Sequence, residues 1–301
     1  TPSPWAAPPQ RLSKIQQSVL TIKEELQKII IGQEEFIDLL LAALFSGGHV
    51  LVEGVPGIAK TLTAKMLAKS LDVAYARIQF TPDLMPSDVT GTTVFNMQTS
   101  DFSFSEGPIF SNVVLIDEIN RSPAKTQAAL FEVMEEYQVT VDGTTYPMAY
   151  PFFVIATQNP IEQEGTYKLP EAQLDRFLFK INIEYPSLAE EKSILRRFRT
   201  DFNLAQKDVV QSIFSAADIK ACQLAVEQVH IKDELLDYIA EIIHNTRNNG
   251  DLFLGASPRA SLAIMKSAKA IAAMNGRDFV TPDDIQYVAY HVLNHRIILT
   301  P

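Results

Sequence analysis

The chain has 301 residues, 47% of them hydrophobic, so it can bury one large core or two modest ones. Its formal net charge of -10 argues against a groove that neutralises many nucleic-acid phosphates, so nucleic acid is an unlikely partner. A single cysteine, Cys222, fits a reducing cytoplasm, and the apolar runs fall well short of the roughly 18 residues of a membrane-spanning helix, so we expect a cytoplasmic protein without a membrane segment.

Three parts follow one another along the chain. Residues 1–10 carry four prolines and are predicted to be a tail or linker outside the fold. From Arg11 to about Tyr185, helical patterns alternate with short apolar runs, which is typical of an α/β domain with a parallel sheet. After Pro186 the pattern is helical only, which predicts a second, all-α domain over residues 186–301.

Strands and hairpins of the first part can be placed from local pattern. A helix over Glu34–Phe45 leads through two glycines into a strand over His49–Glu53. Asp142-Gly143 predicts a tight hairpin turn within Gln138–Pro147, and alternating phenylalanines suggest a second ribbon over Val94–Phe104. The other predicted strands are Val73–Phe80, Val113–Asp117 and Phe152–Thr157. In the second part, Ser257-Pro258 predicts a helix start with a hydroxyl N-cap.

The first predicted strand runs directly into the sequence GVPGIAKT, residues 54–61. Small residues before a helix let backbone N–H groups face a phosphate, Lys60 can reach the β- and γ-phosphates, and Thr61 can ligate Mg²⁺. Ala59 replaces the usual glycine before the lysine, which a helical backbone tolerates. The alternative for this stretch alone is an ordinary glycine-containing turn. The pattern predicts an ATP and Mg²⁺ site.

Two adjacent carboxylates end the apolar run VVLIDEIN, residues 113–120. Asp117 is suited to hold Mg²⁺ through its water shell. Glu118 is suited to deprotonate the attacking water and, because strand side chains alternate, should point elsewhere. The alternative is that this pair lies in a solvated turn after a core strand. That alternative is disfavoured because a phosphate loop precedes the pair by about 60 residues.

Further polar residues follow in an order that suits ATP hydrolysis. Asn159 ends the run FFVIATQNP, which should lie beside the first two strands and help to position the water. Arg176 in LPEAQLDRF and Arg259 in GASPRAS could stabilise a transferring γ-phosphate. Either arginine could instead be a surface or salt-bridge residue. His291 and His295 share a helix face but have no third ligand beside them, so we interpret them as ordinary helix histidines.

Taken together, these segments resemble the MoxR family of AAA+ ATPases, a P-loop group with an insert in helix 2. The resemblance covers about Leu12 to Pro301 and also includes TPDLMPSD, QVTVDG and the continuous stretch over residues 151–177. It implies an αβα sandwich with a five-stranded parallel sheet, followed by a smaller helical lid. In such proteins Ala59 is the usual residue, and the two ribbons match the helix-2 insert and the hairpin that precedes sensor 1.

The family also implies roles for individual residues. Asp117 and Glu118 would form Walker B, and Asn159 would be sensor 1. Arg176 would be an arginine finger offered to a neighbouring subunit, and Arg259 the sensor 2 residue of the lid. Other implied nucleotide contacts are Ile31, Gly32 and Gln33 at the adenine and, around Walker A, Gly54, Val55, Pro56, Gly57, Ile58, Ala59, Lys60, Thr61 and Leu62.

Such a finger implies a ring, usually a hexamer, with ATP between subunits. Family members resemble chaperone-type motors that mature or activate other proteins, often with a von Willebrand factor A domain partner, which rests on analogy alone. Two alternatives remain from the residues: a nucleotide-dependent switch without turnover, which Glu118 disfavours, and a DNA-directed AAA+ relative, which the acidic charge disfavours.

Overall fold

The computed structural model describes residues 10–54, 58–159 and 166–301. The predicted tail falls almost wholly outside these residues, and so do Val55, Pro56 and Gly57 of the phosphate-loop motif. Helices within them are α1 (Gln10–Gln27), α2 (Glu34–Ser46), α3 (Ile58–Ser70), α4 (Pro86–Thr90), α5 (Ala124–Glu136), α6 (Glu171–Leu174), α7 (Leu188–Phe198), α8 (Ala216–Glu227), α9 (Asp233–Arg247), α10 (Pro258–Met274) and α11 (Pro282–Leu293). No described helix is both long enough and apolar enough to cross a membrane.

A five-stranded parallel sheet forms the centre of the molecule, in the strand order β2-β5-β8-β1-β9. Its strands are β1 (Val50–Gly54), β2 (Tyr75–Gln79), β5 (Val113–Asp117), β8 (Phe153–Gln158) and β9 (Phe179–Ile183). The predicted strands at 49–53, 73–80, 113–117 and 152–157 are therefore confirmed, and β5 matches its predicted bounds. Parallel strands buried on both faces carry continuous apolar runs, as the sequence of β5 does.

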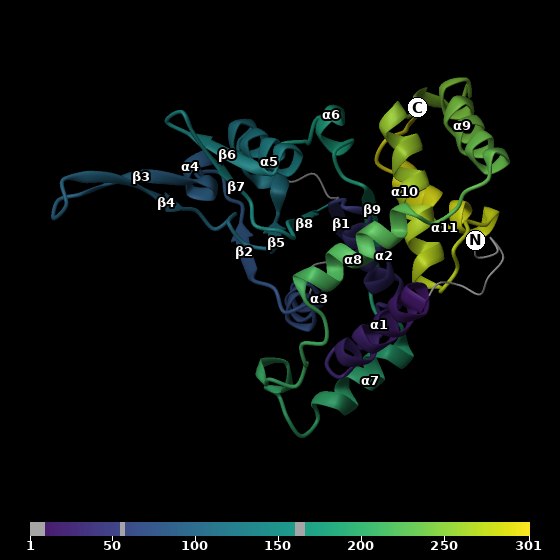
Figure 1. Ribbon diagram of the computed structural model, residues 1–301, viewed down its shortest axis with the longest axis horizontal. Helices are drawn as coiled ribbons and strands as arrows, with labels where there is room; N and C mark the ends of the chain where they lie inside the picture. Colours follow the sequence, from purple (N-terminus) through teal and green to yellow (C-terminus); the bar gives the residue numbers. More distant parts are fainter. Residues whose placement is uncertain (1–9, 55–57, 160–165) are drawn as a thin grey trace, which may run out of the picture.

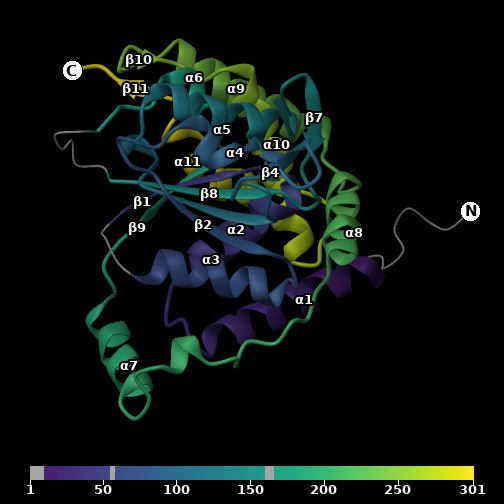
Figure 2. The ribbon, with the colours of Figure 1, turned by 90° about the vertical axis from the view of Figure 1, so that its left-hand side faces the viewer.

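Alternation along each strand divides the apolar core into two layers. Val50 and Val52 of β1 pack with Val113 and Leu115 of β5 in the cluster that includes α1, α2 and α3. Leu51 belongs instead to the cluster that contains α5. We call these sides the α3 face and the α5 face, and Figure 2 shows α1 and α3 on one side of the sheet with α4 and α5 on the other. The predicted αβα sandwich is confirmed.

Two antiparallel ribbons project from the sandwich on the side away from the C-terminal helices (Figure 1). The longer is formed by β3 (Gly91–Asn96) and β4 (Asp101–Glu106), and the shorter by β6 (Gln138–Val141) and β7 (Thr144–Pro147). Asp142 and Gly143 connect β6 and β7 with φ of 50° and 78°, the left-handed backbone that a tight hairpin turn needs. Both predicted ribbons are confirmed.

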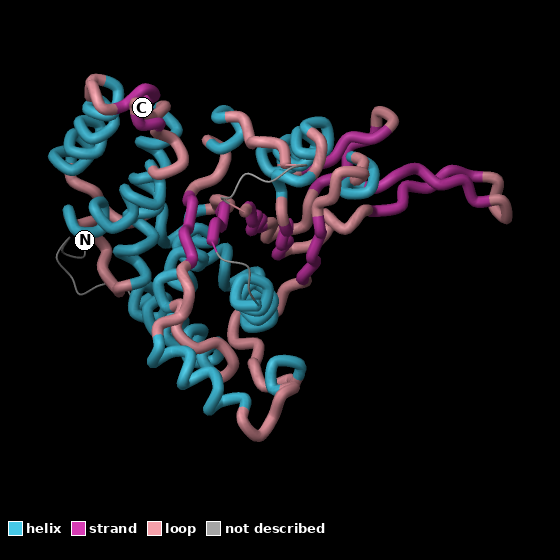
Figure 3. Tube along the Cα trace, turned by 180° about the vertical axis from the view of Figure 1, so that it is seen from behind, coloured by secondary structure: helices cyan, strands magenta, loops and turns pink. Residues whose placement is uncertain are grey.

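The C-terminal part is helical, as Figure 3 shows from behind, with one addition. A short ribbon of β10 (Leu252–Leu254) and β11 (Ile298–Leu299) joins the loop after α9 to the segment after α11. The sequence analysis missed it because pairing between strands of three and two residues leaves no periodic pattern. The division at residues 185 and 186 stays a prediction. Helix α8 packs closely on α2, where Gln223 Nε2 donates a hydrogen bond to the Leu44 carbonyl at 2.7 Å.

Candidate nucleotide-binding site

Lys60 lies in the first turn of α3, the helix that follows β1 in the chain. It is 9% exposed, and its Nζ donates a hydrogen bond to the Gly54 carbonyl at 3.1 Å. Burial lowers the pKa of Lys60, while the negative charges of Asp117 and Glu53 act in the opposite direction. An ammonium held in this way, at the N-terminus of a helix, faces the position where phosphate oxygens are favoured. Thr61 follows in the same turn and is half-buried.

Asp117 ends β5 on the α3 face, two positions after Leu115. Its Oδ1 accepts a hydrogen bond from Thr157 Oγ1 at 3.0 Å. Its Oδ2 accepts from Arg77 Nε at 2.7 Å and pairs with Arg77 Nη2 at 2.5 Å. The carboxylate therefore has a fixed orientation at the carboxyl edge of the sheet, on the same side as Lys60.

Glu118 adopts a left-handed backbone, with φ of 54° and ψ of 54°, immediately after the strand. Its direction therefore comes from a turn at the end of β5, whereas the prediction derived it from strand alternation. Its backbone N–H donates to Thr157 Oγ1 at 3.1 Å, and its Oε2 pairs with Arg121 at 2.8 Å. Because the side chain is 43% exposed, it remains accessible to a water molecule at the edge.

Thr157 and Arg77 were missed by the sequence analysis. Thr157 is buried in β8, and its single hydroxyl accepts from the Glu118 backbone while donating to Asp117. Arg77 lies on β2, the neighbour of β5, where Gln79 pairs with Asp117 in register. For Thr157, the only sequence feature that pointed to the site was its position directly before the predicted Gln158-Asn159 pair. No sequence feature pointed to Arg77.

The predicted adenine contacts lie between α1 and α2. Gly32 and Gln33 have positive φ, of 71° and 59°, which turns the chain sharply before α2 begins. A Cβ on Gly32 would lie 2.6 Å from Oε2 of Glu190. The loop that contains Ile31 therefore packs directly against α7, the first helix after the sheet.

Asn159 follows β8 and lines a cavity of about 1000 Å³ between the carboxyl edge of the sheet and the C-terminal helices. The floor is polar, because Glu53 accepts a hydrogen bond from Gln158 Nε2 at 2.5 Å and pairs with Lys180 at 3.4 Å. These side chains point to the α5 face. Among the described residues, neither Lys60 nor Asp117 lines this cavity.

Arg176 and Arg259 lie together on the α5 face. Both form ion pairs with Glu135 of α5, Arg259 at 2.8 Å, and Arg176 Nη1 also donates to the Phe131 carbonyl at 3.4 Å. Burial lowers the pKa of Arg176, and the nearby charge of Arg259 lowers it further. Within a single chain, therefore, both arginines form salt bridges. Neither is brought to Lys60 or Asp117 by a described contact.

Thr61 and Asp117 fit a magnesium site in which ATP supplies further oxygens. A hydroxyl and a carboxylate are hard oxygen ligands, and Mg²⁺ is usually held by one or two protein groups together with substrate phosphates. The described residues contain no group of three or more His, Cys, Asp or Glu side chains that could hold a metal without such help. His291 instead contacts Glu35, and His295 contacts the Phe177 carbonyl.

Two family models match the chain. Residues 49–179 match the ATPase family associated with various cellular activities (AAA), and residues 244–301 match an AAA lid domain. The first range contains Lys60, Asp117, Glu118 and Arg176, and the second contains Arg259.

Individual relatives match over most of the chain. The uncharacterized protein YeaC of Bacillus subtilis is 49% identical over 92% of this chain and 86% of its own length. Chaperone MoxR1 of Mycobacterium tuberculosis is 43% identical over 98% of this chain and 80% of its own length. A crystal structure of a candidate ATPase from Cytophaga hutchinsonii, 45% identical, superimposes with a TM-score of 0.89 over 97% of this chain and 90% of that one.

Proposed function

This chain belongs to the MoxR family of AAA+ ATPases, and we propose that it hydrolyses ATP with Mg²⁺ to drive the remodelling of partner proteins. One observation carries the proposal. Lys60, which follows β1, lies close enough to Asp117 at the end of β5 to feel its negative charge, and Thr157 of β8 bonds both Asp117 and the backbone of Glu118, the next residue. In open parallel sheets this edge is where ligands bind.

In the proposed site, the triphosphate lies over the N-terminus of α3 on the α3 face. Lys60 contacts the β- and γ-phosphates, and Thr61 and Asp117 hold Mg²⁺, Asp117 through water. Bound Mg²⁺ would neutralise charge that develops on the phosphates. The adenine lies near the turn at Gly32, beside α7, with Ile31 and Gln33 around it.

Glu118 accepts a proton from the attacking water, and Asn159 helps to orient that water. Glu118 must first leave Arg121, its partner in the structure. That exchange is inexpensive because both side chains of the pair are about half exposed, and an exposed ion pair contributes at most about 1 kcal/mol.

Arg176 and Arg259 act on the nucleotide of a neighbouring subunit. Within the chain both arginines pair with Glu135 of α5, and no described contact brings either of them to Lys60 or Asp117. A contact between one subunit's arginines and the next subunit's nucleotide is heterologous, and repeated heterologous contacts form a ring when the rotation between subunits closes. We propose a hexamer by family resemblance.

The remodelling activity is supported by relatives. One relative is named a chaperone, and the family resemblance adds a von Willebrand factor A domain protein as a partner and the cytoplasm as location. The client protein is not specified by any residue of the chain.

The first test is Glu118→Gln. We expect the variant to bind ATP as the wild type does and to lose steady-state phosphate release by about 100-fold or more, because a positioned general base is removed while Lys60 is kept. Phosphate release and binding of a fluorescent ATP analogue are measured together. The matched control is Glu241→Gln, the same charge change on the exposed face of α9.

Equal phosphate release by wild type and Glu118→Gln would remove the ATPase proposal. If both bind ATP and change a partner without turnover, the protein is a nucleotide-dependent switch. If the Glu241→Gln control also loses turnover, the effect belongs to charge or folding rather than to the base.

A further inference from the structure

Arg296 follows α11 and is nearly buried, with 8% of the residue exposed. Its Nε donates to Asp175 Oδ1 at 2.7 Å. Its Nη1 donates to the carbonyls of Leu178 at 3.1 Å and Val292 at 2.8 Å, and its Nη2 donates to those of Asp175 at 3.0 Å and Phe177 at 2.8 Å. A guanidinium has five N–H donors, and all five are used here.

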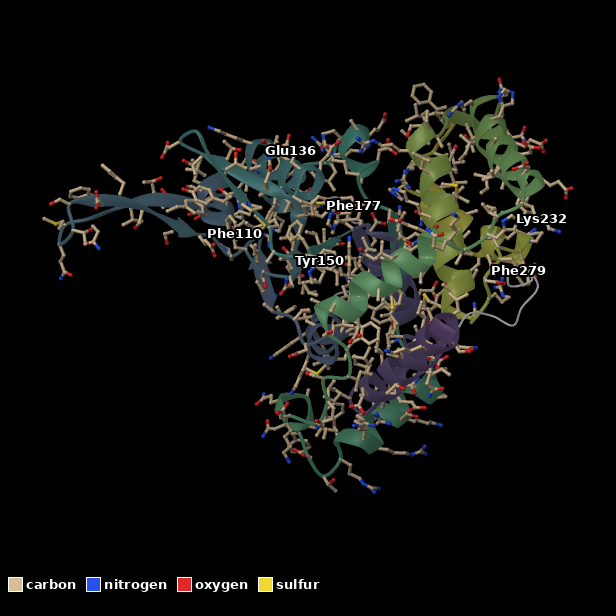
Figure 4. All side chains as sticks on the ribbon, in the orientation of Figure 1. Phe110, Glu136, Tyr150, Phe177, Lys232 and Phe279 are labelled. Atoms are coloured by element: carbon tan, nitrogen blue, oxygen red, sulfur yellow. The ribbon has the colours of Figure 1, made fainter. Side chains whose placement is uncertain are left out.

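Four of these five bonds go to residues 175–178, which we call the finger segment because it contains Arg176. Two further contacts come from the C-terminal helical part. The Ser257 hydroxyl donates to Asp175 Oδ2 at 2.8 Å, and His295 Nε2 lies 2.9 Å from the Phe177 carbonyl. Phe177, fully buried, lies where the sandwich meets the C-terminal helices (Figure 4). Ser257, His295 and Arg296 are called the lid clamp.

The lid clamp fixes the backbone on both sides of Arg176. Carbonyls before and after Arg176 are bonded to the same guanidinium, so the peptide planes cannot rotate without leaving a buried donor unpaired. Such a loss costs about 1–3 kcal/mol, and more for a charged group. The finger segment is thereby held by the C-terminal helices, even though it lies between α6 and β9 in the sandwich.

The same clamp connects the two arginines of the proposed site. Ser257 begins the α10 helix two residues before Arg259, and it contacts the residue that precedes Arg176. Both arginines also share Glu135. Any movement of the C-terminal helices must therefore carry Arg176 and Arg259 together or break the clamp.

We propose that Arg296 and Asp175 are positioning residues, which join the finger segment to the C-terminal helices so that Arg176 and Arg259 reach the next subunit's nucleotide as one unit. The inference rests on the proposed function, since it requires hydrolysis at shared sites. A displacement of a catalytic group by 1 Å can cost about 100-fold in rate, so the clamp is expected to act on turnover rather than on ATP binding.

The test uses Arg296→Lys in the full chain. Lysine keeps a positive charge beside Asp175 but has three donors on one nitrogen, so it cannot replace the five bonds that the guanidinium makes from its three nitrogens. We expect kcat to fall by about 100-fold with KM for ATP unchanged within about threefold, because the variant's own Lys60 and Asp117 are untouched. Thermal melting confirms that the variant is folded.

Mixing with Glu118→Gln separates positioning from a general structural defect. An Arg296→Lys subunit keeps Glu118 and can receive a well-placed Arg176 from a Glu118→Gln neighbour, so turnover should recover in the mixture. A mixture of Arg296→Lys with Arg176→Ala should stay inactive, since neither supplies a placed arginine. The reference mixture is Arg176→Ala with Glu118→Gln.

The inference is overturned, and the proposed function left intact, if turnover recovers in the reference mixture but not in the mixture of Arg296→Lys with Glu118→Gln. Wild-type kcat in Arg296→Lys alone has the same consequence. Failure of the reference mixture, or no turnover by the wild type, overturns both. Should Arg296→Lys not fold, Ser257→Ala takes its place. That variant removes one hydrogen bond to Asp175 and should show a smaller loss with the same recovery, and wild-type kcat would then overturn the inference.

Discussion

On the α3 face of the sheet, the groups of the proposed site come from short continuous stretches at the ends of adjacent strands. Lys60 and Thr61 follow β1, and Asp117 and Glu118 follow one another at the end of β5. On the α5 face, Arg176 is placed by residues from α5, from the start of α10 and from the segment after α11. The first arrangement is local in sequence, and the second is assembled over more than a hundred residues.

This difference has a physical origin. Phosphate binding uses backbone N–H groups at a helix N-terminus, so one loop and its helix supply most of the contacts. An arginine that must reach another subunit has no such local scaffold. Its backbone has to be held by tertiary contacts, here a buried guanidinium with five bonds and a carboxylate shared by two arginines.

Arg176→Ala gives the largest effect expected on the α5 face. An arginine finger contributes about 10³ or more to the rate, so kcat should fall by about that factor while ATP binding on the α3 face is unchanged. Phosphate release and nucleotide binding are measured side by side. Arg199→Ala, an exposed arginine at the end of α7, is the control for the loss of one positive charge.

Loss of ATP binding in Arg176→Ala would contradict the division between the two faces, because a residue of the α5 face would then be needed for binding on the α3 face. Wild-type turnover would show that Arg176 is only the salt-bridge partner of Glu135.

The two faces also differ in how far the sequence predicted them. Four strands of the sheet, the helix predicted over 34–45 and both ribbons followed from period and turn residues, whereas β9 was not placed. The lysine and carboxylates of the α3 face followed from spacing alone. Ser257 is the N-cap residue of α10, as predicted, but its hydroxyl donates to Asp175, 82 residues away, and makes no capping hydrogen bond. A side chain's choice between a local and a distant partner depends on what the fold brings near, which local pattern does not contain.

Glu135 and Arg296 were missed for the same reason. Each is an ordinary charged residue in a helical pattern, and neither has a neighbour in sequence that suggests its partner. The family resemblance assigned roles to Arg176 and Arg259 but did not indicate that they share one carboxylate. A buried arginine becomes recognisable only once its five acceptors are in place.

A pH-sensitive contact lies at the amino end of the α5 face. His49 is buried, accepts a hydrogen bond from the Val154 N–H at its Nδ1 at 3.0 Å, and has its Nε2 3.2 Å from the Met134 carbonyl. Burial lowers the pKa of His49 from 6.5 to about 4, while the contact with Met134 acts in the opposite direction.

As the pH falls below 6.5, the unfolded chain takes up a proton at this position that the folded chain does not. The free energy of unfolding should therefore decrease between pH 6.5 and 4, by about 3 kcal/mol in total, and be unaffected by His49 above that window. Urea unfolding at pH 7 and pH 5 measures the change. His49→Gln, although less stable at pH 7, should show a flatter dependence, and an equal slope in both proteins would contradict the assignment.

The smallest expected effect tests whether the α3 face is as local as its motifs suggest. Arg77, on the neighbouring strand β2, bonds the same Asp117 oxygen through two nitrogens and would compete with a hydrated Mg²⁺ for that carboxylate. Because Arg77 is half exposed, the pair is worth at most about 1 kcal/mol, so Arg77→Gln should lower the Mg²⁺ concentration for half-maximal turnover by only about threefold. Arg121→Gln removes the same charge beside Glu118 and should leave that concentration unchanged. If Arg77→Gln raises the requirement instead, Arg77 orients Asp117 for the metal, and the α3 face, like the α5 face, depends on a partner that its own motif does not contain.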